Sequence, residues 1–195
     1  MKGNSDVKSI LLVGVGGQGI LRASDILCHV MMEADLDVKK SEVHGMAQRG
    51  GSVISHVRYG KRVYSPIAKP GDVDILVSFE KLETLRYINY LTPEGYVIIN
   101  EREIYPPSVN LGDATYPPHI IEMIKRTGNI VKVVHAQRVA LMAGDMRTEN
   151  TALLGALSSY LKRLDISLWE KVIKESFHKK AVEVNLKAFH IGRAA

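Results

Sequence analysis

The sequence predicts an α/β fold, a mainly parallel sheet flanked by helices, with a helical C-terminal third. Three observations lead to this prediction. Short apolar runs rich in β-branched residues alternate with segments of helical periodicity through most of the chain. The first apolar run ends in a glycine-rich turn that leads directly into an amphipathic segment. From Gln137 onward the pattern is helical almost to the end.

Apolar spacing predicts the first elements. Residues 9–13 form a compact β-rich run, and the glycines of residues 14–19 end it. Residues 19–34 place apolar side chains three and four positions apart, as in an amphipathic helix packed on a sheet. Residues 36–40 are the candidate second strand. These elements predict an opening βαβ unit of a Rossmann-like sheet.

The middle of the chain continues the alternation. Residues 42–51 have neither strand nor helix periodicity and are predicted to form an ordered loop. A helix follows the fourth strand, and Glu80 and Glu83 are expected to stabilise its N-terminus. The predicted elements are strands over 52–58, 73–79, 96–100 and 130–135 and helices over 80–91 and 119–126.

Three helices are predicted in the C-terminal third, over 148–164, from Ser167 onward and over 182–189. Ser167 and Glu170 have the spacing of a capping box, in which each side chain accepts a free backbone N–H of the first turn. The length of 195 residues predicts a single domain over residues 1–195, with an α/β core over about 1–145 and a helical extension over about 146–195.

The composition is that of an ordinary globular protein. Apolar residues make up 46% and charged residues 24%, which excludes disordered, collagen-like and disulfide-scaffold classes. The net charge of +5 comes from dispersed basic residues, so nucleic-acid binding is not expected. Residues 1–8 are polar and no apolar run approaches the ~18 residues of a membrane span. We expect a cytoplasmic protein.

Cysteine and histidine spacing limits the chemistry of this chain. Cys28 is the single cysteine, so an internal disulfide, a CxxC zinc site and a four-cysteine iron–sulfur cradle are excluded. Its place on the apolar face of the first helix predicts a buried packing residue. The histidines show neither HxxxH nor HxH spacing, so no metal site is predicted. No nucleophile motif is present, and no catalytic residue is assigned.

The first candidate binding segment is the turn formed by Gly14, Gly16, Gly17, Gln18 and Gly19. It matches G-x-G-x-x-G after a strand and before a helix, where backbone N–H groups can approach an anion such as a pyrophosphate. A dinucleotide site normally has a carboxylate at the tip of the second strand, whereas residues 39–41 here are Lys-Lys-Ser. A nucleotide site, a tight turn and a protein contact all remain open.

The second candidate segment gathers polar side chains among glycines. It contains Glu42, His44, Gln48, Arg49, Gly50 and Gly51. Because ligands of open α/β sheets bind outside the carboxyl ends of strands, we expect this segment and the glycine turn to meet at one sheet edge. The alternative is an ordered loop whose polar groups satisfy only its own backbone.

Four segments in register carry a family resemblance. They are residues 14–19 (GVGGQG), 41–53 (SEVHGMAQRGGSV), 71–80 (GDVDILVSFE) and 150–155 (NTALLG). Together they resemble the gamma domain of the 2-oxoacid:ferredoxin oxidoreductases, over about residues 7–193. The 44–51 segment is similar to that of the small beta subunit in the indolepyruvate branch of this family.

The resemblance implies a division of labour. A large partner chain would carry thiamine diphosphate, magnesium and iron–sulfur clusters, and would decarboxylate an aryl pyruvate and pass electrons to ferredoxin. Coenzyme A would be the acyl acceptor and a candidate shared ligand. This chain would bind no cofactor of its own and would be inactive alone. Because both candidate segments are glycine-rich, polar and expected at one sheet edge, our hypothesis is that they form one surface that completes the partner's active site.

Two other function classes remain open. One is a free-standing NAD(P)-binding Rossmann protein. The other is a purely structural subunit whose helical C-terminal third docks the partner through apolar positions that include Leu153, Leu157 and Trp169. Self-association of the isolated chain through a surface meant for the partner is a further expectation.

Overall fold

The computed structural model describes residues 7–45 and 51–195, except for the side chain of His44. Its centre is a six-stranded sheet in the order β2-β3-β1-β4-β5-β6. The strands are β1 (Lys8–Val15), β2 (Asp37–His44), β3 (Ser52–Gly60), β4 (Val73–Ser78), β5 (Leu91–Asn100) and β6 (Ile130–Val134). The helices are α1 (Ile20–Glu33), α2 (Lys81–Tyr87), α3 (Pro107–Asn110), α4 (Ile120–Lys125), α5 (Ala136–Ala143), α6 (Glu149–Ser158), α7 (Ile166–Ser176) and α8 (Lys179–Ala194), with 3-10 turns at Ile88–Tyr90 and Met146–Thr148.

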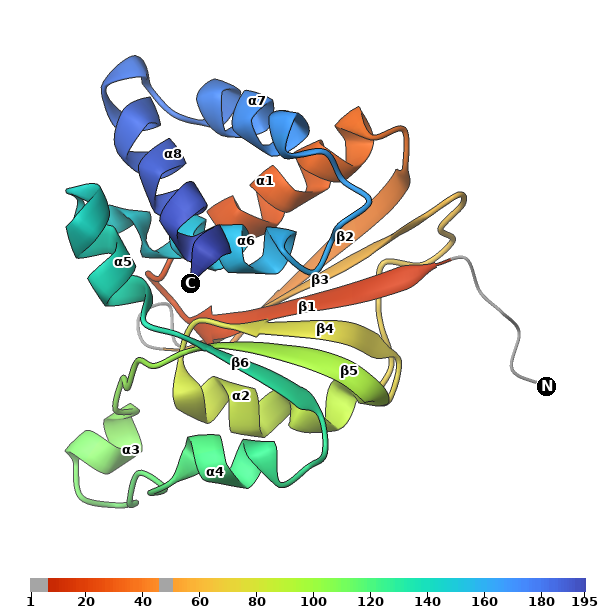
Figure 1. The fold of residues 1–195 in the computed structure, drawn as a ribbon. Helices are drawn as coiled ribbons and strands as arrows, with labels where there is room; N and C mark the ends of the chain where they lie inside the picture. The colour runs from red at the N-terminus through yellow and green to blue at the C-terminus, as the bar shows by residue number, and fades with distance from the viewer. Residues whose placement is uncertain (1–6, 46–50) are drawn as a thin grey trace.

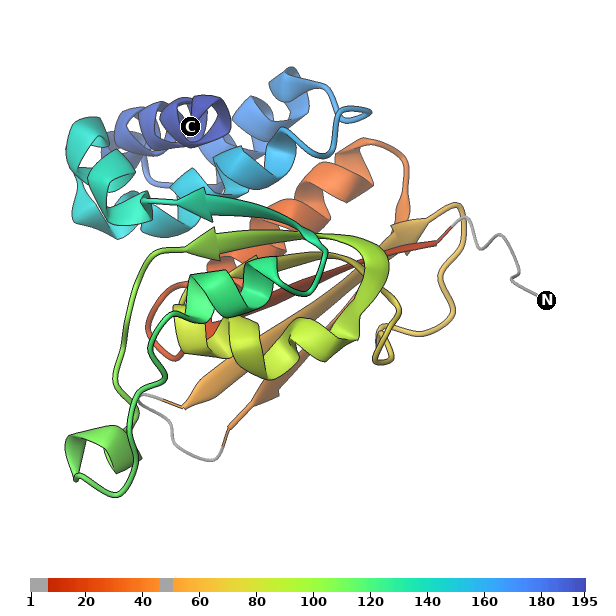
Figure 2. The ribbon, with the colours of Figure 1, turned by 60° about the horizontal axis from the view of Figure 1, so that its bottom comes forward.

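The predicted fold class is confirmed, because helices cover both faces of a mainly parallel sheet. β1, β4, β5 and β6 pair in parallel. Figure 1 shows α1, α6, α7 and α8 on one face, and Figure 2 shows α2 and α4 across the other. Alternate side chains of β1 enter two separate cores: Ile10 and Leu12 face the first helix layer, and Leu11 and Val13 face the second.

The expected parallel pairing of the first two strands is wrong. β3 lies between β1 and β2 and is antiparallel to both. The predicted loop also begins later than expected, because β2 continues through His44 and Glu42 lies opposite Ser55. The polar sequence of this segment suits an edge strand, where charged side chains face solvent and discourage pairing with another chain.

Several element boundaries differ from the prediction for local reasons. α7 begins at Ile166 because the Asp165 carboxylate accepts the Ser167 N–H at 2.8 Å, so the capping box predicted at Ser167 is wrong. The helix predicted over 148–164 ends at Ser158. The helix predicted over 182–189 is longer than expected, because α8 runs from Lys179 to Ala194. The strand predicted over 96–100 begins earlier, because β5 runs from Leu91 to Asn100.

The C-terminal helices pack into the chain's own core. Leu153, Leu157, Trp169 and Phe189 are fully buried in the same cluster as Ile10 of β1. These positions therefore do not form a docking surface. The predicted division at about residue 145 stays a prediction. No helix in the described part of the chain is long and apolar enough to span a bilayer.

Close packing of α6 on α8 depends on two glycines. A Cβ added at Gly155 would lie 2.1 Å from the Phe189 carbonyl oxygen, and one added at Gly192 would lie 2.1 Å from the Ala152 carbonyl oxygen. Both obstacles are backbone atoms, which cannot move aside as a side chain can.

We expect Gly155→Ala and Gly192→Ala each to lower the free energy of unfolding by about 1–3 kcal/mol or more, because the helices must separate. Denaturant unfolding of the purified chain measures this. Lys187→Ala, on the exposed face of α8, is the control and should stay within about 0.5 kcal/mol of the parent. Equal stability of all three variants would contradict the packing argument.

Candidate functional site

The glycine turn meets the β2–β3 hairpin at one edge of the sheet, where β2 ends and β3 begins. Val15, at the end of β1, pairs with Ser52, and the Gly16 N–H donates to the Gly51 carbonyl at 2.9 Å. The Gly45 N–H donates to the Ser52 carbonyl at 2.8 Å. The expected juxtaposition of the two segments is thus confirmed for the described residues. It arises because β1 and β2 both run antiparallel to β3 and so end on the same side.

Three of the predicted site residues lie outside the described residues. These are Gln48, Arg49 and Gly50. The backbone of His44 pairs with Val53 at the end of β2. The binding roles of the whole set, from Gly14 to Gly51, stay predictions.

Two glycines of the turn have backbone conformations that other residues rarely adopt. Gly17 has a φ of 99° and Gly19, the N-cap of α1, has a φ of 78°. A Cβ at Gly19 would also lie 2.6 Å from the amide nitrogen of Asn150, at the start of α6. The missing side chain at Gly19 therefore lets the N-terminal ends of α1 and α6 approach each other.

The Gln18 side chain builds the turn. Its Oε1 accepts the Val15 N–H at 2.8 Å, and its Nε2 donates to the Phe79 carbonyl at 2.8 Å. The amide therefore joins the end of β1 to the residue that follows β4. Because β1 and β4 are adjacent and their helices α1 and α2 cover opposite faces, this is the switch point where ligands of open α/β sheets bind.

A second amide ties the neighbouring strands together at the same edge. Asn100, the last residue of β5, donates from Nδ2 to the Phe79 carbonyl at 3.2 Å and accepts the Ala136 N–H of α5 at 3.2 Å. The Phe79 carbonyl thus accepts hydrogen bonds from two side-chain amides, those of Gln18 and Asn100. The ends of β1, β4 and β5 are held by side chains rather than by backbone pairing alone.

Glu80 is a buried carboxylate, 1% exposed, that organises the start of α2. Its Oε2 accepts the Glu83 N–H at 2.9 Å, which confirms the expected N-terminal role. Its Oε1 accepts the Tyr116 hydroxyl at 2.6 Å and the Ile104 N–H at 3.2 Å. Burial and the bond to Glu80 raise the pKa of the Tyr116 hydroxyl, so it remains a proton donor at neutral pH.

An ion pair and a histidine–carboxylate contact, each between residues distant in sequence, lie at this edge, and the sequence pattern did not predict them. Arg102 Nη1 lies 2.5 Å from Glu149 Oε1, at the start of α6, and His135 Nδ1 lies 2.5 Å from Glu101 Oε2. Contacts between residues so far apart produce no recognisable pattern in a short stretch of sequence. Asn150, in contrast, had a sequence signal, because it opens the 150–155 segment of the family resemblance.

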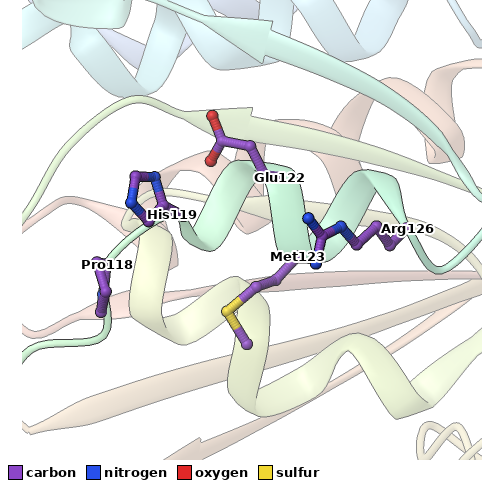
Figure 3. Close-up of a pocket in the computed structure, with 5 residues that line it drawn as sticks. All are labelled: Pro118, His119, Glu122, Met123 and Arg126. Carbon is purple, nitrogen blue, oxygen red and sulfur yellow. The ribbon is translucent and has the colours of Figure 1, made fainter.

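Two surface depressions lie apart from the predicted site residues. One is on the outside of α4, and Figure 3 shows the side chains that line it. The other lies between α1 and α7. Their linings are Pro118, His119, Glu122, Met123 and Arg126 for the first, and Arg22, Asp25, Ile26, His29, Val172, Glu175 and Ser176 for the second. Neither lining includes a residue of the glycine turn or the hairpin.

Cys28 is buried, which confirms the packing role expected from its position. Burial raises the pKa of its thiol to about 11, against the lowering effect of the nearby Lys40 ammonium. Among residues 7–45 and 51–195, no three His, Cys, Asp or Glu side chains are grouped to hold a metal ion.

Gln18→Ala should lower the free energy of unfolding by about 1–3 kcal/mol, because the Val15 N–H loses its acceptor at a partly buried position. Urea denaturation measures the change. Gln137→Ala removes the same side chain from an exposed site on α5 and should have little effect. A loss at Gln137 as large as that at Gln18 would contradict a special role for the turn amide.

Cys28 should react slowly with a disulfide reagent at pH 8 in the folded chain. With a pKa of about 11, about 0.1% of the thiol is ionised at that pH, against about 10% for an ordinary thiol of pKa 9.0. Absorbance of the released thiolate measures the rate, and the urea-unfolded chain is the control. Similar rates for folded and unfolded chain would show that Cys28 is accessible.

The chain is similar in sequence to subunits of known oxidoreductases. A family model described as pyruvate ferredoxin/flavodoxin oxidoreductase matches residues 9–195. Indolepyruvate oxidoreductase subunit IorB of Pyrococcus horikoshii is 43% identical over 191 residues, covering 94% of this chain and 93% of the relative. The subunit of the same name from Archaeoglobus fulgidus is 41% identical over 187 residues, with 94% and 92% covered. The pyruvate/ketoisovalerate oxidoreductases common subunit gamma of Pyrococcus abyssi is 28% identical, with 90% and 89% covered.

Solved structures share the fold. Pyruvate oxidoreductase subunit PORC of Thermotoga maritima superposes with a TM-score of 0.75 at 20% identity, covering 97% of each chain. A chain of the 2-oxoglutarate:ferredoxin oxidoreductase of Magnetococcus marinus superposes with a TM-score of 0.76 at 19% identity, covering 98% of this chain and 31% of that chain. The family model spans nearly all of the sequence, and relatives above 40% identity match it almost end to end. The chain therefore belongs to the pyruvate ferredoxin/flavodoxin oxidoreductase family.

Proposed function

We propose that this chain is the small subunit of a 2-oxoacid:ferredoxin oxidoreductase that acts on indolepyruvate or a related aryl pyruvate. The support is a set of four relatives named indolepyruvate oxidoreductase subunit IorB, three of which match at 41–43% identity and one at 34%, each over most of both lengths. Four relatives named for pyruvate and ketoisovalerate are 25–28% identical. In the proposed reaction the oxoacid and coenzyme A give an acyl-coenzyme A and carbon dioxide, and the electrons pass to ferredoxin.

The redox cofactors of such a reaction do not fit the side chains of this chain. Its one cysteine cannot supply the thiolates of an iron–sulfur cluster. We assign thiamine diphosphate, magnesium and the clusters to a large partner subunit, and no step of their chemistry to this chain. The isolated small subunit is then inactive.

The contribution of this chain is the edge where the glycine turn meets the hairpin. The observation that carries the proposal is the Gly16–Gly51 hydrogen bond, which joins the glycine turn to the described end of the 42–51 segment. Backbone N–H groups at the start of α1 suit a phosphate group, such as those of coenzyme A. We propose that this surface completes the partner's active site and contacts the partner or part of coenzyme A.

The arrangement of β2 disfavours the alternative of an NAD(P)-binding protein. In a dinucleotide site the ribose carboxylate stands on the strand next to β1. Here β3 occupies that place and β2 is one strand further away. Glu42 of β2 is paired with Lys40 at 2.6 Å. Titration with NADH should therefore leave its fluorescence unchanged.

The first test is to tag this chain in its native host and purify it without oxygen. A large chain with iron–sulfur absorption should co-purify, identified by mass spectrometry, and the complex should reduce viologen only with both indolepyruvate and coenzyme A. Purification as a self-associated chain without a partner, or viologen reduction by this chain alone, would contradict the proposed subunit role.

The second test asks whether the edge acts in catalysis. Arg49→Ala should lower turnover or raise the KM for coenzyme A by about tenfold while the complex stays assembled, which corresponds to about 1.4 kcal/mol of lost binding. Arg126→Ala, at an exposed arginine directly after α4, is the matched control and should leave the kinetics unchanged. Parent kinetics for Arg49→Ala would instead favour a purely structural subunit.

A further inference from the structure

Helix α2 is tied to the start of β3 by three polar side chains. The Ser52 hydroxyl donates to Glu83 Oε2 at 2.5 Å and lies 3.1 Å from the Tyr87 hydroxyl oxygen. Arg86 Nε lies 3.2 Å from Glu83 Oε1. Both oxygens of the Glu83 carboxylate are therefore engaged, one by β3 and one by its own helix.

Helix capping does not account for the position of the Glu83 side chain. The free N–H of Glu83 is already accepted by Glu80, so the N-terminus of α2 has its cap without the Glu83 carboxylate. The Glu83 side chain is only 5% exposed. Burying a carboxylate is costly unless it is hydrogen-bonded and paired, and Ser52 and Arg86 supply those partners.

Ser52 occupies the junction of the candidate site. It follows Gly51, whose carbonyl accepts the Gly16 N–H, and its own carbonyl accepts the Gly45 N–H. It also stands opposite Val15, the last residue of β1. The Gly51 carbonyl belongs to the peptide unit that joins Gly51 to Ser52. A hydrogen bond that holds the Ser52 side chain therefore also restrains this carbonyl, which accepts the Gly16 N–H.

We propose that Ser52 and Glu83 are positioning residues that set the placement of the Gly16–Gly51 contact, so that α2 controls the geometry of the glycine turn from the opposite face of the sheet. Neither residue is assigned a direct contact with substrate. The consequence for catalysis rests on the proposed function, whereas the consequence for the turn does not.

Amide hydrogen exchange of the full chain, followed by NMR, tests the positioning role without any activity. Ser52→Ala should speed exchange at the Gly16 and Gly45 amides by about tenfold or more and leave α6 and α8 unchanged. Ser52→Thr keeps the hydroxyl and should restore parent exchange. Glu103→Gln breaks the half-exposed ion pair between Lys81 of α2 and Glu103 and is the control for disturbing this helix. Parent exchange at Gly16 in Ser52→Ala would overturn the proposal.

Kinetics of the assembled complex separate this proposal from the proposed function. If Ser52→Ala speeds exchange and also raises the KM for coenzyme A, with rescue by Ser52→Thr, both proposals are supported. If exchange is faster and the kinetics are those of the parent, the positioning role holds and the catalytic role of the turn fails. Should Ser52→Ala not fold, Glu83→Gln, which replaces the charged acceptor of the Ser52 hydroxyl with an amide of similar shape, provides the same exchange measurement with a smaller expected increase. Parent exchange at Gly16 in Glu83→Gln would then overturn the proposal.

Discussion

The double hydrogen bond of the Gln18 amide is the constraint on which the candidate site depends. A turn with two left-handed glycines has many conformations open to it in the unfolded chain. Gln18 selects one of them by holding the Val15 N–H and the Phe79 carbonyl at once, so the turn is fixed to the end of β4 as well as to β1. Only with the turn so placed does the Gly16 N–H meet the Gly51 carbonyl of the hairpin.

Much of the fold was predictable because its central strands are continuous apolar runs. β1 and β4 are buried on both faces of the sheet, and their continuous apolar sequences are typical of such central strands. The end of β2 was not predictable in the same way, since an edge strand that carries Lys40 and Glu42 resembles a loop in composition. Strand order was missed for a different reason. The insertion of β3 between β1 and β2 depends on pairing across the whole sheet, which no local window contains.

In the candidate site, too, local features were predictable from the sequence and contacts between separate elements were not. The glycines and the polar hairpin were found from sequence because their residue types are unusual over a short stretch. The side chains that hold them in place were not, since Gln18 contacts Phe79 and Ser52 contacts Glu83 across separate elements. Both carboxylates at the start of α2 were expected to serve the helix terminus. Glu80 does so as the N-cap, and Glu83 lies in the first turn of α2, but its carboxylate also accepts the Ser52 hydroxyl of β3, a contact that the sequence pattern does not contain.

The antiparallel insertion of β3 also explains why a glycine motif of dinucleotide-binding type need not bind a dinucleotide. The motif supplies only a turn and the start of a helix, and the remaining contacts come from the neighbouring strand. In this chain the neighbour runs the other way, so it presents its first residues, Gly51 and Ser52, to the turn in place of a strand tip. The strand next to the glycine turn therefore supplies backbone groups at its start, not the carboxylate that a dinucleotide site needs at a strand tip.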